Sequence, residues 1–269
     1  MMEKKTEKKN YNILMILSIA ILCIFTVGLE FISISYTTDA FRNKMIGKIL
    51  QQGCGIGATV LLMIKSDIKL FKKPKNLLYL IPCLIIAIDN FPFWAYFSQK
   101  LQIVRTQALD WVLFSGYCFS VGVFEECIFR GIIFSVLASR LSRDRKGFLQ
   151  TYVISSFIFG AAHLLNGFSA ATILQICYTT LTGGLFAFAL IKTKNIFCCG
   201  IIHAIYNFCG LLLIELGSGF KFDVGTTVMM GIISVVIGVF VLYKVYKCPN
   251  EEIEELYENM GIKFKEKAK

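Results

Sequence analysis

Residues 195–214 read NIFCCGIIHAIYNFCGLLLI, a run of 20 positions that contains no aspartate, glutamate, lysine or arginine. A helix of about 20 mostly apolar residues is long enough to cross the hydrocarbon core of a bilayer. His203 and Asn207 are polar side chains inside this run, four positions apart. The stretch therefore predicts a transmembrane helix that carries polar groups at membrane depth.

Similar apolar runs occupy most of the chain on both sides of this stretch. The sequence of 269 residues is 56% hydrophobic and only 17% charged, whereas about 25% of the residues in an average soluble domain are charged. We therefore predict an all-α integral membrane protein, a bundle of about eight transmembrane helices. The predicted spans are residues 11–34, 46–64, 77–97, 108–138, 147–164, 170–191, 195–214 and 225–243.

The lysines and arginines predict the orientation. With the N-terminus inside, the inner segments hold 21 of these residues and the outer segments hold 6. Such an excess is typical of cytoplasmic segments. We expect a multi-pass protein of the cell membrane, with a cytoplasmic N-terminal segment at 1–10, a membrane domain at 11–243 and a cytoplasmic charged tail at 244–269. The tail could form a short amphipathic helix at the inner surface or a solvated charged segment.

Composition also excludes some classes of partner and cofactor. The formal net charge of +10 comes from basic residues at the edges of apolar runs, as membrane topology requires, so we expect the bilayer and no nucleic acid as a partner. The ten cysteines form no C-x-x-C pair and nine of them lie in or beside apolar runs. They predict neither a disulfide framework nor a thiolate metal site.

Ionisable residues inside membrane spans are costly and usually functional. The span at 108–138 contains Glu125, Glu126 and Arg130, and the only two histidines of the chain, His163 and His203, also lie in predicted spans. The concentration of these groups in three spans predicts a functional site there.

The spacing of these residues predicts some of their partners. Glu126 and Arg130 are four positions apart, so they can form an ion pair on one helix face. Glu125 points about 100° away from Glu126 and needs a partner on another helix, for which His163 and His203 are candidates. The simpler interpretation is that each histidine only hydrogen-bonds between helices. His203 and Asn207 also share one helix face.

The depth of the site gives conflicting signals. At 1.5 Å per residue, Glu125 and His163 lie about 22 Å and 25 Å from the basic cluster at 140–146, whereas His203 lies only about 14 Å from Lys194. For the three side chains to meet, the helix at 195–214 must tilt or begin deeper in the membrane.

Three motifs carry a resemblance to a known family. Glu125-Glu126-x-x-x-Arg130, Phe159-x-x-x-His163 and His203-x-x-x-Asn207, in this order, resemble the motifs of the CPBP family of CAAX proteases and bacteriocin-processing enzymes, also called the Abi family. The resemblance covers about residues 108–214. It implies an eight-helix bundle with its site in an intramembrane cavity, and an endopeptidase that cleaves a membrane-associated protein or peptide.

The resemblance also implies a role for each motif residue. Glu125 and His163 would activate a water molecule, and His203 and Asn207 would stabilise the oxyanion. Glu126 and Arg130 would brace the site. Family members are often described as metalloproteases, and Glu125, His163 and His203 could bind zinc. Because no H-E-x-x-H motif is present, we favour glutamate catalysis without a metal or other cofactor.

Two non-enzymatic interpretations use the same polar residues. In a proton-coupled transporter, Glu125, His163 and His203 would form a proton relay, although the sequence shows no repeated half of the kind usual in such transporters. In an immunity factor, the cavity would bind a peptide without cleaving it.

Overall fold

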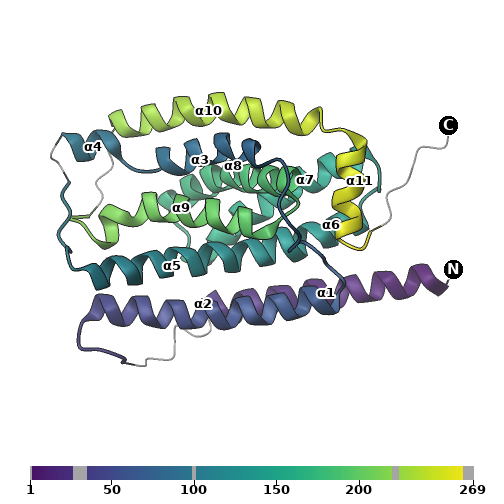
Figure 1. Cartoon of the computed structure of the whole chain (residues 1–269), viewed down its shortest axis with the longest axis horizontal. Helices are drawn as coiled ribbons and strands as arrows, with labels where there is room; N and C mark the ends of the chain where they lie inside the picture. The colour runs from purple at the N-terminus through teal and green to yellow at the C-terminus, as the bar shows by residue number, and fades with distance from the viewer. Residues whose placement is uncertain (1, 27–34, 99–100, 220–223, 263–269) are drawn as a thin grey trace.

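The structure is a computed structural model that describes residues 2–26, 35–98, 101–219 and 224–262, and all the regular secondary structure in these ranges is helical. The long helices lie side by side along the longest axis of the molecule (Figure 1). Of the described helices, five are long and apolar enough to cross a membrane: Ala40–Lys65, Arg145–Leu165, Thr172–Thr193, Ile196–Glu215 and Val228–Tyr246. The predicted class, an all-α integral membrane protein, is confirmed.

The helices match the predicted spans closely. In chain order they are α1 (Met2–Thr26), α2 (Ala40–Lys65), η2 (Leu77–Tyr79), α3 (Leu80–Asp89), α4 (Phe93–Phe97), α5 (Ala108–Glu126), η3 (Cys127–Ile133), α6 (Phe134–Arg140), α7 (Arg145–Ala161), η4 (Ala162–Asn166), α8 (Ala170–Thr193), α9 (Ile196–Glu215), α10 (Val224–Tyr246) and α11 (Asn250–Asn259). Each predicted span lies on one or more of them. Residue 1, the end of the first span at 27–34 and the last tail residues, 263–269, lie outside the described residues.

The predicted span at 77–97 is not one helix. α3 ends at Asp89, and the short α4 begins only after Pro92. Proline has no amide hydrogen and disfavours the helical conformation of the residue before it, which explains the break. The side-chain amide of Asn90, at the break, donates a hydrogen bond of 2.9 Å to the carbonyl of Tyr206 on α9. The break is thus tied to the helix that carries His203.

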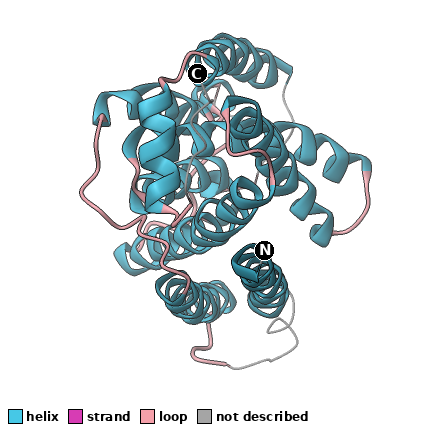
Figure 2. Ribbon diagram, turned by 90° about the vertical axis from the view of Figure 1, so that its right-hand side faces the viewer, coloured by secondary structure: helices cyan, strands magenta, loops and turns pink. Residues whose placement is uncertain are grey.

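Both ends of the described chain lie at the same end of the bundle, and α11 lies across that end (Figure 1). Figure 2 looks at this end and shows the long helices nearly end-on, grouped into one bundle. α11 buries Leu256 and Tyr257, and its Glu252 accepts a 2.7 Å hydrogen bond from Lys192. The charged tail therefore contains an amphipathic helix, and this helix packs on the protein itself.

Glycines let α5 and α9 cross in close contact. A Cβ atom on Gly122 would lie 2.7 Å from the backbone nitrogen of Ala204, and one on Gly200 would lie 3.1 Å from Cα of Val123. Small residues at a crossing allow two membrane helices to approach this closely. The contact brings the middle of α9 next to the last turn of α5, where the two glutamates lie.

Candidate active site

Glu126 and Arg130 form the ion pair that their spacing predicts. Nε of Arg130 lies 3.2 Å from Oε2 of Glu126, and both side chains are completely buried. Arg130 also donates a 2.8 Å hydrogen bond through Nη2 to the carbonyl of Gly183 on α8. Its guanidinium carbon lies 4.4 Å from the ring centroid of Phe159 on α7. Arg130 therefore joins three helices around one buried charge pair.

The pair lies at a change in helix type. α5 ends at Glu126 and continues without a break into η3, a π-helical segment that contains Arg130. π-helical turns are rare in proteins and occur often at functional sites.

His203 contacts both glutamates. Its Nδ1 atom lies 3.0 Å from Oε1 of Glu126, and its Nε2 atom lies 3.8 Å from Oε2 of Glu125. A carboxylate that is paired with Arg130 only accepts hydrogen bonds, so Nδ1 of His203 must be the donor. The imidazole is therefore held with Nε2 directed toward the side of Glu125.

Two aromatic rings fix the plane of this imidazole. Phe186 on α8 stacks on His203, with 4.5 Å between ring centroids and 20° between ring planes. Phe159 meets His203 edge-on at 5.7 Å and His163 edge-on at 5.6 Å. Phe159 and Phe186 are both buried, so the rings leave His203 little freedom to turn.

Glu125 and His163 face a small cavity. Its volume is about 100 Å³, and it is lined by Leu22, Thr26, Glu125, Phe129, Ala162, His163 and Leu165. The side chain of Glu125 is 23% exposed, unlike that of Glu126. Nδ1 of His163 donates a 3.2 Å hydrogen bond to the carbonyl of Phe159, one turn earlier. Of the two glutamates, only Glu125 is open to a reactant.

The conflict over depth is resolved by the start of α9. Lys194 and Asn195 are only 3% and 5% exposed. The segment after α2 covers them, because the amide of Ile196 bonds to the carbonyl of Leu70 at 2.9 Å and the side chain of Asn195 bonds to the carbonyl of Lys72 at 2.5 Å. α9 thus begins under a covering segment of the protein, and His203 lies level with the glutamates, 3.0 Å from Glu126.

Asn207 is the least integrated of the predicted site residues. It lies one turn after His203 on α9 and is half-buried. Among the described residues, no hydrogen bond joins its side chain to Glu125, His163 or His203, and it is not part of the cavity wall. The structure thus brings Glu125, His163 and His203 into one region and leaves Asn207 beside it.

The geometry also bears on zinc. In the described part of the chain, no three His, Cys, Asp or Glu side chains are grouped so that they could hold a metal ion. Glu125, His163 and His203, the set that zinc would need, are not arranged as a ligand set here. The nearest strong partner of His203 is Glu126, which occupies its Nδ1 atom.

The segment that carries these residues matches a known family. Residues 107–209 match the family model of Rce1-like, type II CAAX prenyl endopeptidases. CAAX prenyl protease 2 of Saccharomyces cerevisiae is 28% identical over 100 residues, which are 32% of this chain and 32% of the yeast protein. The match thus spans about a third of the length of that relative. No solved structure matches the chain. The resemblance to the CPBP family is confirmed for the segment that carries all three motifs.

Proposed function

We propose that this chain, whose residues 107–209 resemble the type II CAAX prenyl endopeptidases, is an intramembrane endopeptidase that cleaves a membrane-associated protein or peptide. The observation that carries the proposal is the cavity of about 100 Å³ with Glu125 and His163 in its wall. A water molecule has a share of about 30 Å³ of liquid volume, so the cavity has room for the attacking water beside these two residues.

Glu125 is the general base. Its carboxylate takes a proton from the water, whose oxygen then attacks the carbonyl carbon of the scissile peptide bond. His163 helps to hold and polarise the same water. The carboxylate later passes the proton to the leaving nitrogen as the C–N bond breaks, so the protons balance over the reaction.

His203 and Asn207 stabilise the oxyanion of the tetrahedral intermediate. The hydrogen bond from Nδ1 to Glu126 directs Nε2 of His203 toward Glu125, the side from which the water attacks. Because Nδ1 already carries a proton, Nε2 donates to the oxyanion only when the ring carries both protons, so His203 acts as an imidazolium in this step. A donor aimed in advance at the developing charge stabilises the transition state by about 3 kcal/mol. Glu126 and Arg130 act only by bracing His203.

We propose that the reaction needs no metal. The chain has no H-E-x-x-H motif, and Asn207, one turn after His203, suits an oxyanion site better than a set of zinc ligands. The test is prolonged chelation followed by metal analysis: an active, zinc-free enzyme is expected. Loss of activity that is restored by one equivalent of zinc per chain would make Glu125, His163 and His203 zinc ligands.

The first substrate to test is a peptide that ends in an S-farnesylated Cys-aliphatic-aliphatic-X sequence, because the matching family and the yeast relative are both prenyl proteases by name. The wild type should cleave the peptide, and Glu125→Gln should not. Glu255→Gln is the control and should still cleave it, because Glu255 lies on α11, outside the candidate site. Glu125→Gln should retain the uncut peptide. A transporter or a peptide-binding immunity factor would release no product in any of the three forms, and that result would overturn the proposal.

We also propose that both termini lie in the cytoplasm. The lysine and arginine bias supports this orientation, and so does the shared position of the two ends of the described chain, near Met2 and Ile262. Protease added to intact cells should leave a C-terminal tag intact. The same protease added to inverted membrane vesicles should remove the tag.

A further inference from the structure

We propose that α1 is a lateral gate of the active-site cavity, and that the lipid-borne, apolar part of the substrate enters from the bilayer between α1 and η4. The inference rests on the proposed function and adds the route to the site. It starts from the cavity wall, in which Leu22 and Thr26 come from α1 and face Ala162 and Leu165 of η4.

The rim of this cavity has the character of a lipid-facing surface. Ile24 on α1 is 49% exposed, Leu165 is 50% exposed, and Phe168, just after η4, is 84% exposed. Glu125 lies near the middle of the continuous helix from Ala108 to Arg140, so the rim is at the depth of the hydrocarbon core. An apolar rim at that depth fits an apolar ligand that arrives within the membrane.

The cavity as it stands is too small for a peptide. Pockets that bury a drug-sized ligand have volumes of about 300–1,000 Å³, several times the volume found here. One wall must therefore move before a scissile bond can reach Glu125. Glu125 and Phe129 lie on α5 and η3, which the contacts of Arg130 hold in place. The other walls are α1 and η4, and we assign the movement to α1.

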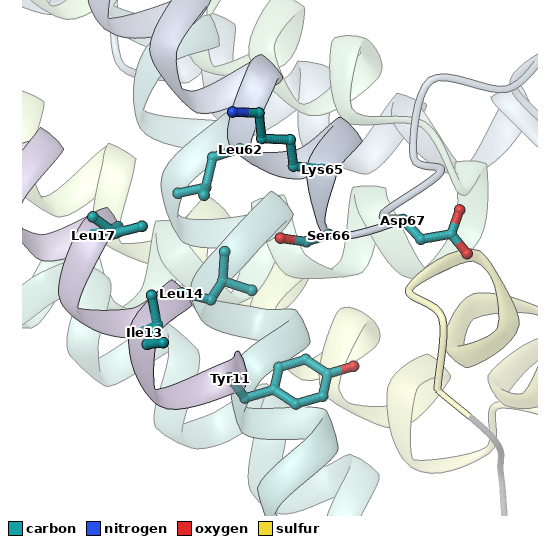
Figure 3. A pocket seen from close by; sticks show the side chains of 8 residues that line it. All are labelled: Tyr11, Ile13, Leu14, Leu17, Leu62, Lys65, Ser66 and Asp67. Carbon is teal, nitrogen blue, oxygen red and sulfur yellow. The ribbon is translucent and has the colours of Figure 1, made fainter. Parts of the chain in front are cut away.

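α1 is held loosely enough to move. At its first membrane turns, a second cavity of about 450 Å³ separates α1 from the end of α2 (Figure 3). Tyr11, Leu14 and Leu17 line it on one side and Leu62 and Lys65 on the other. This cleft is open to the outside, so α1 and α2 diverge there, while Leu14 and Leu22 of α1 stay buried against the rest of the bundle.

The other end of α1 is held by the ring of Phe25, which meets Phe124 edge-on at 6.3 Å, and by hydrogen bonds to the carbonyl of Phe25. The side-chain amides of Gln51 and Gln52 on α2 both donate to the carbonyl of Phe25, at 2.7 and 3.0 Å. Oε1 of Gln52 is buried and has no hydrogen-bond partner within the described ranges, so this contact is incompletely satisfied. These contacts hold α1 beside Thr26, and they must break or shift when the gate opens.

Site-directed photo-crosslinking tests the route. p-Benzoylphenylalanine is introduced at Thr26 or Leu165 of the Glu125→Gln form, in phosphatidylcholine vesicles that contain the farnesylated peptide. The controls carry the same group at Ile19 on α1 and at Leu164 on η4, which are 46% and 47% exposed but do not line the cavity. Crosslinking to the peptide should be several-fold stronger at Thr26 and Leu165 than at the controls. Equal crosslinking at all four positions would overturn the gate.

A kinetic experiment separates this inference from the proposed function. Thr26→Trp should lower kcat/KM for the farnesylated peptide several-fold by narrowing the entrance, and Ile19→Trp should leave it unchanged. If the wild type cleaves the peptide and Thr26→Trp is fully active, the gate is wrong and the protease remains. If the wild type does not cleave the peptide, both the proposed function and the proposed gate are wrong.

Discussion

His203 is held by Glu126 through a 3.0 Å contact between Nδ1 and Oε1, while the other oxygen of the same carboxylate lies 3.2 Å from Arg130. One buried carboxylate thus connects a positive charge on η3 to the imidazole on α9. This arrangement gives the two neighbouring glutamates different tasks: Glu126 is part of the structural support, and Glu125 faces the cavity.

The first prediction follows from this difference. Glu126→Gln should greatly reduce the yield of folded protein, because it leaves Arg130 as a buried charge without its partner, at a cost of about 3–5 kcal/mol. Glu125→Gln should fold normally, because its carboxylate is partly exposed and its 3.8 Å separation from His203 is too long for a hydrogen bond. Yield of monodisperse protein and Tm in detergent measure both. A well-folded but inactive Glu126→Gln would instead indicate a direct catalytic role.

The second prediction concerns Phe186, a residue that no sequence motif marks. Phe186→Leu removes the ring that stacks on His203 and lets the imidazole turn, which should lower kcat by as much as about a hundredfold with little change in KM. Phe188→Leu is the matched control, because Phe188 is equally buried on the same helix and packs on Tyr79. Both variants should lose similar stability, and only the first should lose kcat. Equal kcat values would show that the stacking has no part in catalysis.

The third prediction tests the α5–α9 crossing. A methyl group on Gly122 would lie 2.7 Å from the backbone of Ala204, so Gly122→Ala should push the helices apart and weaken the contact of His203 with Glu126. Activity and Tm should both fall. Gly57→Ala on α2 has open space around the added methyl group and should leave activity intact, with a gain in helix stability of up to about 1 kcal/mol. A Gly122→Ala protein as active as Gly57→Ala would mean that the crossing can relax without moving the site.

The sequence predicts most of the spans but only part of the site. Apolar length is a local property, so the runs at 46–64 and 195–214 could be found without a structure, and the structure places these helices at Ala40–Lys65 and Ile196–Glu215. The Glu126–Arg130 pair is also local, since helical periodicity places residues four apart on one face. The break at Pro92 shows the limit of this approach, because a hydropathy profile does not separate one span from two short helices.

Contacts between helices depend on the depth in the membrane at which each helix begins. The sequence of a single apolar run does not determine this depth. The spacing from Lys194 suggests that His203 is too shallow, because it assumes that Lys194 lies at the membrane surface. In the structure, Lys194 is buried and the segment after α2 covers the start of α9, so the position of Lys194 is a poor marker of the depth of His203. The stacking of Phe186 likewise follows from the packing of α8, for which the sequence gives no signal.

The fourth prediction uses this buried lysine. Burial lowers the pKa of Lys194 from its usual value near 10.5 to about 8. At a pH between these two pKa values, Lys194 is protonated in the unfolded chain but not in the folded protein. The free energy of unfolding should therefore rise as the pH increases from 8 to 10.5. Below pH 8 the full penalty, of up to about 3 kcal/mol, acts on the folded state.

Lys194→Met should remove this rise and should be more stable than the wild type at pH 7. Lys73→Met, at an exposed lysine in the neighbouring segment, should keep the wild-type pH dependence. The measurement is the Tm of the wild type and of both variants from pH 7 to 10 in one detergent. Parallel Tm curves for the wild type and Lys194→Met would mean that Lys194 does not titrate in this range.

The fifth prediction concerns His203 and Asn207 as the oxyanion pair. They lie one turn apart on α9, so both side chains can reach one point beside the helix. If they bind the oxyanion, they act mainly on the transition state, and their loss should lower kcat with little change in substrate affinity. Asn207→Ala removes one neutral donor, which commonly costs about a hundredfold in rate. His203→Ala should cost more, because it also frees the carboxylate of Glu126.

The two variants should differ in stability as well. Asn207 makes no hydrogen bond to the other site residues in the described structure, so Asn207→Ala should keep its Tm, whereas His203→Ala should lower it by removing the contact with Glu126. The double variant should be less impaired than the product of the two single losses, because residues that act as one unit are not additive. Cleavage rates and peptide affinities in detergent test each step. An unchanged kcat in Asn207→Ala would remove Asn207 from the site and leave His203 as the sole side-chain donor to the oxyanion.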